Sequence, residues 1–139
     1  MIAETSYAYT PNDSDYYTNT IGAGNPLSKQ YPFSLQGQAD YLHDLIDTAV
    51  NKTTNCIGVF YWEGTWISAG GSSYSENSSR WEKYGSGWAS SFAAEYDPDD
   101  AGKWYGGCAV DNQAFFDSKG RATEALKAFA LFKNGNMTE

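Results

Sequence analysis

Reactive side chains follow a short apolar run at the start of the chain. Residues 1–3 are apolar, and the next four supply a carboxylate, two hydroxyls and a phenol, from Glu4, Thr5, Ser6 and Tyr7. An apolar run that ends at an acid is typical of a parallel-sheet strand that presents a catalytic carboxylate at its C-terminal edge. Glu4 is therefore the candidate catalytic residue. The alternative is a solvated charge near a frayed chain end.

Oxygen-bearing side chains gather in two stretches that could share a metal ion. In residues 13–19, acidic and amide side chains recur at two-residue steps, as in half of an EF-hand loop, and residues 97–100 are again acidic. Calcium binds about six to eight oxygens, and an ion between two acidic loops would offset their repulsion. We predict a calcium site with the ligands Asp13, Asp15, Tyr17 through its backbone carbonyl, Asn19, Asp97 and Asp100. The alternative is a set of loose surface acids without an ion.

The composition narrows the kinds of partner. Aromatic residues make up 17% of the 139 residues, and charged residues only 19%. This balance favours flat polar ligands that stack on rings, of which sugars are the commonest, although many of the rings should fill a core. The formal net charge of −8 makes nucleic acid and acidic membrane surfaces poor partners. The sequence itself records neither a membrane span nor an export signal.

A strand, a helix and a second strand should position these residues. Residues 8–32 are loop by composition, and Ser34 is the candidate N-cap of a helix. The apolar stripe of this helix consists of Leu35, Ala39, Leu42, Leu45, Ile46, Ala49 and Val50. Its polar face includes Gln38 and a solvated His43. Residues 56–62 are continuously apolar, which predicts a strand covered on both faces. A right-handed crossover then brings Glu4 and Trp62 to the same edge of one sheet.

The second half of the chain should be mostly irregular. Residues 63–107 form a long connection rich in Gly and Ser that carries four tryptophans, and connections of this length are usually functional. A last helix is predicted over residues 123–132, with Gly135 as its stop. Cys56 and Cys108 are predicted to be free buried thiols rather than a disulfide.

Several motifs occur in one order over nearly the whole chain, at residues 1–7, 31–34, 36–39, 58–63, 85–89, 95–104 and 109–114. Together they resemble the endo-β-1,4-galactanases of glycoside hydrolase family 53. The family fold is a complete (β/α)8 TIM barrel of roughly 250 residues or more, of which the resemblance covers the last third. It implies that residues 1–139 are one partial α/β domain with strands seven and eight, their helices and long βα loops. The remainder of the barrel is then expected upstream.

The resemblance also implies roles for particular residues. Family members look like secreted retaining hydrolases of β-1,4-galactan, the side chains of pectin arabinogalactan, and Glu4 matches their nucleophile. The expected sugar contacts are Trp62, Trp88, Trp104, Ser6 and Tyr7. Trp62 would form the floor under the cleaved sugar, and the other two tryptophans would stack on more distant sugars. Bacterial members look as if they bind calcium, with a His at the position of Tyr17.

Retention of configuration makes a demand that one carboxylate cannot meet. A second carboxylate, about 5–5.5 Å from the nucleophile, must protonate the departing oxygen and later activate water. In the family this acid lies on the fourth strand, which this sequence does not contain. Glu63 is the nearest local substitute, and a loop-orienting role is favoured for it. The sequence therefore predicts part of an enzyme, inactive alone. The alternative function is a non-catalytic carbohydrate-binding or structural fragment.

Overall fold

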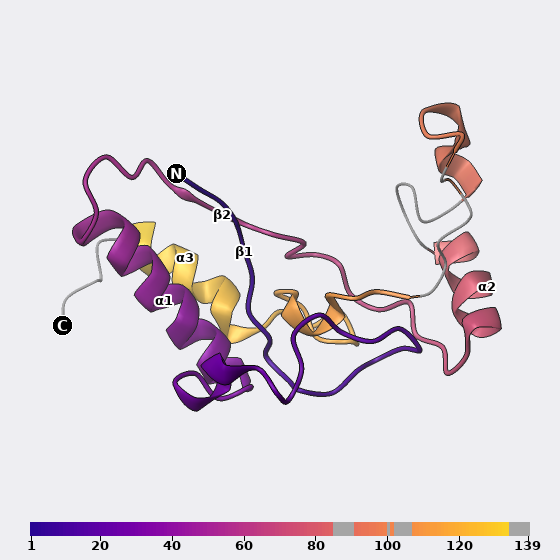
Figure 1. Ribbon diagram of the computed structural model, residues 1–139, viewed down its shortest axis with the longest axis horizontal. Coiled ribbons are helices and arrows are strands. Elements are labelled where there is room, and N and C mark those ends of the chain that lie inside the picture. The colour runs from indigo at the N-terminus through magenta and orange to yellow at the C-terminus, as the bar shows by residue number, and fades with distance from the viewer. Residues whose placement is uncertain (85–90, 100, 102–106, 134–139) are drawn as a thin grey trace.

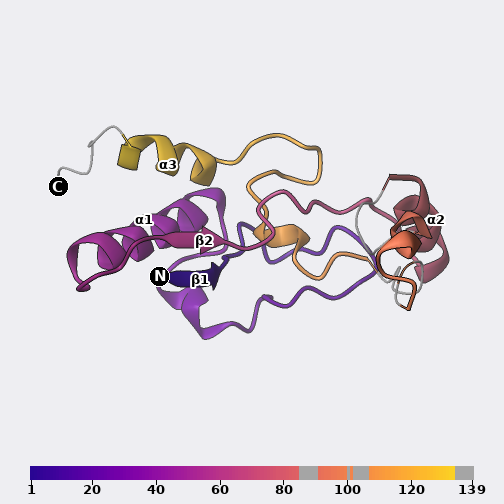
Figure 2. The same ribbon diagram turned by 90° about the horizontal axis from the view of Figure 1, so that it is seen from above.

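The structure is a computed structural model that describes residues 1–84, 91–99, 101 and 107–133. The strands in this part of the chain are β1 (Ile2–Thr5) and β2 (Val59–Tyr61), and the α-helices are α1 (Leu35–Asn51), α2 (Tyr74–Tyr84) and α3 (Glu124–Lys133). Short 3-10 helices lie at η1 (Pro26–Lys29), η3 (Ser91–Glu95) and η4 (Asp111–Gln113). Figures 1 and 2 show α1 and α3 beside the two strands, whereas α2 lies at the far end of long loops.

The two strands pair in parallel, as the βαβ pattern predicts. Ile2 pairs with Val59 and Thr5 pairs with Tyr61. Both strands are shorter than the predicted ranges 1–7 and 56–62. The predicted coverage of the second strand on both faces is wrong, because Phe60 is 61% exposed. Tyr61, which points the other way, packs against the helices. One face of the sheet is therefore covered and the other is open.

Helix α1 forms where its sequence signals place it. Its first turn is capped by Ser34, whose side chain accepts a hydrogen bond of 2.9 Å from the Gly37 backbone N–H. Gly37 lies so close to the preceding loop that a Cβ at this position would overlap the Pro32 carbonyl oxygen. The predicted apolar stripe is only partly correct, because Leu35 and Val50 at its two ends are exposed.

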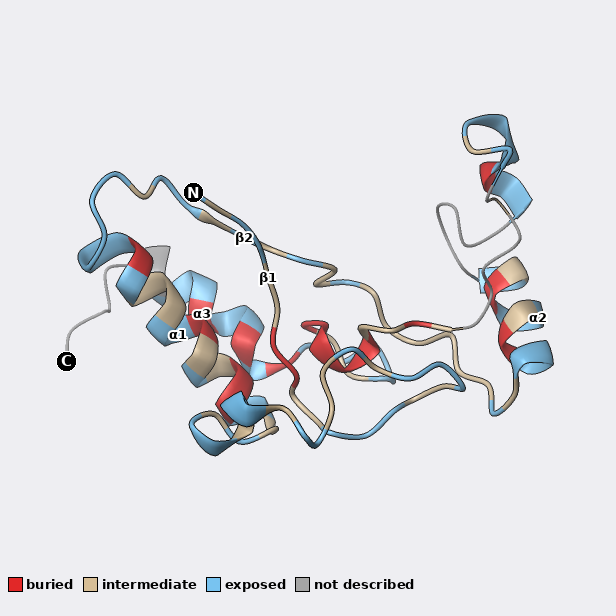
Figure 3. Cartoon of the chain, viewed as in Figure 1, coloured by how far each residue is buried: buried red, intermediate tan, exposed pale blue. Residues whose placement is uncertain are grey.

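The main core lies between α1 and α3. Leu42 of α1 packs with Phe115, Ala125 and Ala128, and Tyr61 of β2 borders this cluster. Full burial of a side chain such as Leu or Phe stabilises a fold by roughly 1.5–3 kcal/mol. Helix α3 begins one residue later than predicted, and the predicted stop at Gly135 lies outside the described residues. Figure 3 shows the buried residues concentrated where the end of β1, η4 and the two helices meet.

Helix α2 lies in the stretch predicted to be irregular, so that part of the prediction is wrong. Its first turn is capped by local hydrogen bonds: the Glu76 backbone N–H donates to Ser73 Oγ, and the Ser72 backbone N–H donates to the Glu76 carboxylate. On its buried side, Trp81 packs with Cys108 in a second, smaller core. Figure 1 shows η3 further along, beyond α2.

Three smaller expectations can be compared with the structure. Cys56 and Cys108 are free thiols, as predicted, although Cys56 is only partly buried. His43 is exposed on α1 beside Asp44, as predicted for a solvated side chain. Within the described residues, no helix combines the length and apolar character that a membrane crossing requires.

Candidate active site

The candidate catalytic residue lies at the edge of the sheet where both strands end. The Trp62 backbone N–H donates a hydrogen bond of 2.8 Å to the Thr5 carbonyl, one residue after Glu4. The pairing therefore brings the Glu4 and Trp62 positions to the same edge, as the crossover predicts. Trp62 is 47% exposed, so part of its indole is open to a ligand.

A β-bulge changes the direction of the side chain at position 4. Between the pairs Ile2–Val59 and Thr5–Tyr61, β1 contains one more residue than β2. A bulge of this kind bends a strand and re-aims a side chain. Consistent with this, residues 3 and 4 are both exposed, although consecutive residues of a regular strand alternate between faces. Within the described part of the chain, the Glu4 carboxylate forms no hydrogen bond or ion pair.

Glu63 follows Trp62 and has an unusual backbone. Its φ is 54°, in the left-handed region that non-glycine residues seldom adopt. Its carbonyl accepts a hydrogen bond of 3.0 Å from the Trp66 backbone N–H, which closes a turn as the chain leaves the sheet. Partial burial raises the pKa of the Glu63 carboxyl above its usual value. The turn agrees with a loop-orienting role, and the direction of the pKa suits a proton donor.

The two polar residues after the strand make different contacts. Tyr7 is 1% exposed, donates a hydrogen bond of 2.6 Å to the Tyr31 carbonyl and stacks on the Tyr41 ring, with 4.6 Å between the ring centroids. This burial leaves no surface of Tyr7 for a sugar to contact. Ser6 is half-buried, and its hydroxyl donates to the Gln113 side chain.

A buried hydrogen-bond network holds the end of β1 to η4. Gln38, which the sequence placed on the polar face of α1, is 0% exposed. Its Nε2 lies within hydrogen-bond distance of the carbonyl oxygens of Tyr7, Gln113 and Ala114, at 2.9, 3.1 and 3.1 Å. The Tyr61 hydroxyl donates to the same Gln113 carbonyl at 2.7 Å. Buried polar groups need such partners, so each of these contacts restricts the loop.

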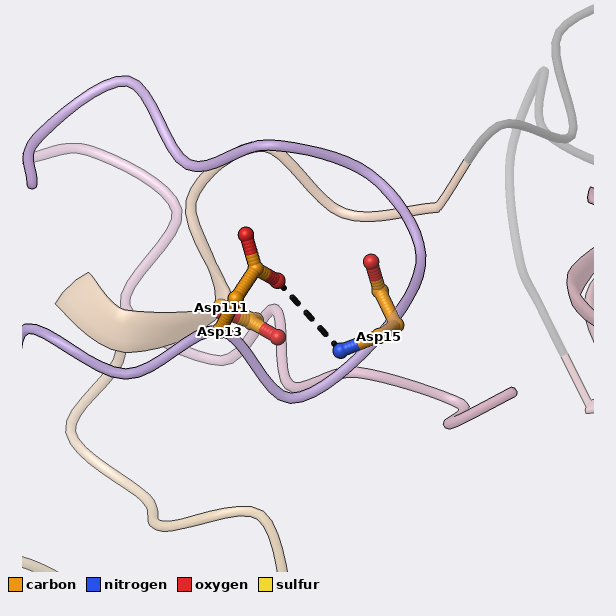
Figure 4. Close-up of side chains that lie close together, drawn as sticks. All are labelled: Asp13, Asp15 and Asp111. Atoms are coloured by element: carbon orange, nitrogen blue, oxygen red, sulfur yellow. Dashed lines mark hydrogen bonds between the residues drawn. The ribbon is translucent and has the colours of Figure 1, made fainter. Parts of the chain in front are cut away.

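A cluster of three carboxylates lies nearby. Asp13 and Asp15, from the loop after β1, meet Asp111 of η4 with one oxygen of each within 4.8 Å of the others. Figure 4 shows the three side chains together, with the hydrogen bond of 3.3 Å from the Asp15 backbone N–H to Asp13 Oδ1. Asp15 is fixed further by Ser68 Oγ and the Cys108 backbone N–H, each 2.9 Å from its Oδ2.

Asp111 is the unusual member of this cluster. It is 2% exposed, and neither of its carboxylate oxygens receives a hydrogen bond of regular geometry from a described residue. Burial, together with the charges of Asp15 and Asp13, raises its pKa to about 6 against the opposing effects of the Asn19 side chain and the Ser14 backbone. The Oδ1 atom of Asn19 is also buried without a hydrogen-bond partner among the described residues. Buried oxygens without donors are what an oxygen-seeking cation requires.

The other predicted ligands and sugar contacts have different positions. The Tyr17 side chain is exposed, and its backbone N–H donates to Asp15 Oδ1 at 2.8 Å. Asp97 lies just after η3 and is not one of the clustered carboxylates. Trp88, Trp104 and Asp100 lie outside the described residues.

Sequence reasoning missed the contribution of η4. Asp111, Asn112 and Gln113 are three consecutive buried polar residues, and each contacts the loop after β1. Asn112 Nδ2 donates to the carbonyls of Thr10 and Ile21, at 3.0 and 2.8 Å. The sequence does contain a signal for this burial. The polar residues 111–113 lie between two apolar pairs, 109–110 and 114–115, so the whole segment is expected to be buried.

Comparison with known proteins points to one family of glycosyl hydrolases. The model of glycosyl hydrolase family 53 matches residues 1–129. The chain is 50% identical to an endo-beta-1,4-galactanase of Bacillus subtilis (strain 168), over 99% of this chain and 32% of that protein. It is 29% identical to an arabinogalactan endo-beta-1,4-galactanase of Cellvibrio japonicus (strain Ueda107), over 96% of this chain and 27% of that protein.

A solved structure supports the same assignment. The chain superposes on the Ignisphaera aggregans GH53 catalytic domain with a TM-score of 0.64 and 34% identity, over 94% of this chain and 29% of that domain. The fold is therefore a fragment of a TIM barrel. One face of the sheet is open because most of the barrel that would enclose it is not in this chain. The chain spans about a third of the length of the curated relatives it matches. The family model covers nearly the whole chain. The chain therefore belongs to glycosyl hydrolase family 53.

Proposed function

We propose that this chain is the nucleophile-bearing part of a secreted, retaining endo-β-1,4-galactanase that cleaves the galactan side chains of pectin. The observation that carries the proposal is the exposed Glu4 at a bulged strand end, on the same sheet edge as Trp62, which is 47% exposed. Family membership supports it, because glycosyl hydrolases of this class work with paired carboxylates.

The chemistry assigned to Glu4 is attack on the sugar. Its carboxylate would bond to the anomeric carbon while a second carboxylic acid protonates the departing glycosidic oxygen. The second group, now ionised, would then remove a proton from water, which releases the sugar from Glu4 with its original configuration. Trp62 would lie under the sugar ring, because an indole face complements the C–H face of galactose.

The second carboxylate is proposed to come from the missing part of the barrel. Glu4 has no hydrogen-bond partner among the described residues, and a nucleophile needs fixed donors to hold its charge and orientation. The uncovered sheet face, with Phe60 and Trp62 exposed, is where the remaining strands would supply them. The isolated chain should therefore show no galactan hydrolysis.

A chimera tests this function. This chain would replace the matching third of the Bacillus subtilis galactanase, with which it shares 50% identity. The chimera should hydrolyse β-1,4-galactan, and Glu4→Gln should lower kcat by roughly four to six orders of magnitude, as when a covalent nucleophile is removed. Glu76→Gln on α2 is the matched control and should keep the parent activity.

Chemical rescue separates a nucleophile from a merely important acid. In Glu4→Ala, azide can enter the vacated space and attack an activated aryl galactobioside from the same side as the lost carboxylate. The product would be the α-galactosyl azide, with inverted configuration. A chimera that hydrolyses galactan without loss on Glu4→Gln, or a Glu4→Ala variant that azide does not restore, would contradict the assignment.

We also propose that the carboxylate cluster binds calcium. Asp13, Asp15 and Asp111 supply oxygens close together, and the buried Oδ1 of Asn19 supplies another without a partner among the described residues. Calcium prefers carboxylate and carbonyl oxygens, so the donor set fits. When bound, it would neutralise the clustered charge and join the loop after β1 to η4. Asp111 takes the place of Asp97 in the predicted ligand set, and Asp100 stays a prediction.

Titration calorimetry of the chelator-treated chimera tests the calcium proposal. The parent chimera should bind one calcium ion that Asp111→Ala binds at least tenfold more weakly. Magnesium should bind poorly, because it demands a tighter octahedral set of ligands. The Asp97→Ala variant is the matched control and should bind calcium as the parent does. Equal binding by the parent and Asp111→Ala would remove this site.

A further inference from the structure

The side chain of Gln113 connects η4 to the strand that carries Glu4. Gln113 is 2% exposed, and its Oε1 accepts a hydrogen bond of 2.5 Å from Ser6 Oγ. Its Nε2 donates to Thr20 Oγ1 at 2.8 Å. Ser6 lies two residues after Glu4, so this contact is made where the chain leaves the sheet.

The backbone of Gln113 is held independently of its side chain. Its carbonyl oxygen accepts from the Tyr61 hydroxyl at 2.7 Å and from Gln38 Nε2 at 3.1 Å. Tyr61 pairs with Thr5 across the sheet, and Gln38 lies on the buried side of α1. Gln113 is therefore anchored to β2 and α1, and its side chain extends this anchor to Ser6.

Glu4 needs such an anchor because the sheet fixes it weakly. The bulge places an extra residue beside Glu4, and the Trp62 N–H to Thr5 carbonyl bond is the last hydrogen bond between the two backbones at this edge among the described residues. A bulged residue lacks a partner in the ladder, so the direction of its side chain depends on what holds the chain on either side.

We propose that Gln113 is a positioning residue for Glu4. Through its hydrogen bond to Ser6, it fixes the end of β1 and so holds the Glu4 carboxylate in line with the anomeric carbon. Gln113 itself touches neither substrate nor Glu4. This inference rests on the proposed function, because it takes Glu4 as the nucleophile.

Trapping of the covalent intermediate measures the step in question. An activated 2-deoxy-2-fluoro-β-galactobioside reacts with the nucleophile, and the bond to its leaving group breaks as the bond to the carboxylate forms. The inactivation rate constant at saturation reports alignment for attack, and the inhibition constant reports binding. In the chimera, Gln113→Met keeps the volume of the side chain without its hydrogen bonds, and Ser6→Ala removes the partner.

Each single variant should lower the inactivation rate constant by roughly tenfold to a hundredfold, the cost of a misplacement of about 1 Å. In Gln113→Met the inhibition constant should change less than about threefold, because Gln113 contacts no sugar. The double variant should be no slower than the slower single variant, because both changes remove one interaction. Thr20→Val removes the other hydrogen bond of the Gln113 side chain and should leave the rate constant within about threefold of the parent.

Three results would overturn the inference: an unchanged rate constant in Gln113→Met, additive losses in the double variant, or an equal loss in Thr20→Val. Mass spectrometry of the trapped parent chimera tests the proposed function separately. Label on a residue other than Glu4 would remove that function and this inference together. Label on Glu4 with unchanged kinetics in the variants would remove only the inference.

Discussion

Replacement of Asp111 by Asn tests the buried carboxylate, and its effect should depend on pH and calcium. In the metal-free protein, burial raises the pKa of Asp111 from its usual 3.8 to about 6. Between pH 3.8 and about pH 6, Asp111 is ionised in the unfolded chain and protonated in the folded chain. The stability contributed by protonated Asp111 is therefore complete below pH 3.8 and is lost as the pH rises through about 6.

The size of the effect follows from the same two values. A rise from 3.8 to about 6 corresponds to roughly 3 kcal/mol of unfolding free energy. The amide introduced by Asp111→Asn carries no charge at any pH. In chelator, the unfolding free energy of the variant should therefore rise relative to that of the parent between pH 4 and pH 7, by up to roughly 3 kcal/mol. Calcium should reverse the order, since an ion at 1,000 times its dissociation constant adds about 4.1 kcal/mol to the folded state that binds it.

Urea unfolding of the chimera, followed by tryptophan fluorescence at pH 4, 5.5 and 7 with chelator or calcium, measures both effects. Glu95→Gln serves as the matched control, because this exposed residue of η3 lies outside the cluster. The reasoning fails if Asp111→Asn and the parent change in parallel with pH in chelator. It also fails if calcium stabilises both proteins equally.

Three further outcomes are expected in the chimera. Gln38→Leu should lower the unfolding free energy in urea by about 3 kcal/mol or more, because several buried carbonyls lose their donor, whereas a loss below about 1 kcal/mol would show that the network is dispensable. Glu63→Gln should reduce kcat less than about tenfold if Glu63 only orients its loop, and a loss above a hundredfold would identify it as the acid. Trp88→Ala should weaken the binding of long galacto-oligosaccharides more than short ones, and equal losses would argue against a distal subsite.

Local signals predicted the first helix and its position. Ser34 caps the helix through its own side chain, and the apolar spacing that includes Leu42 and Ala49 buries those two residues. Both signals act over one or two turns, so neighbouring residues suffice to predict them. The end of the stripe at Val50 is exposed because no described element packs over it. That outcome depends on parts of the fold far away in sequence.

Helix α2 was missed for a different reason. Its sequence is rich in Ser and follows two glycines, Gly70 and Gly71, so composition favours a loop. Ser73 and Glu76 form a capping pattern, but this signal spans only four residues in a stretch rich in Gly and Ser. What stabilises the helix is the packing of Trp81 against Cys108, which lies 27 residues later in the numbering. Propensity alone does not report such a contact.

The site depends on contacts that sequence periodicity cannot show. Gln38 and Gln113 are polar, so pattern reasoning places them on the surface, yet both are buried because they find partners from 23 to 107 residues away. Asp111 entered the sequence analysis only within a motif, without a role. A buried polar residue is predictable only once its partners are known, and these partners come from segments between residue 6 and residue 123.

Each of the three residues of η4 contacts a different part of the loop after β1, so this turn holds the whole loop in place. Asp111 reaches the carboxylate cluster, Asn112 holds both sides of the loop through Thr10 and Ile21, and Gln113 holds Ser6. The loop after β1 contains no α-helix or strand before α1, so these contacts substitute for a regular framework. A substitution in η4 should therefore change Glu4 chemistry and calcium binding to different extents according to its position. Asp111 variants should affect mainly the ion, and Gln113 variants mainly the attack on the sugar.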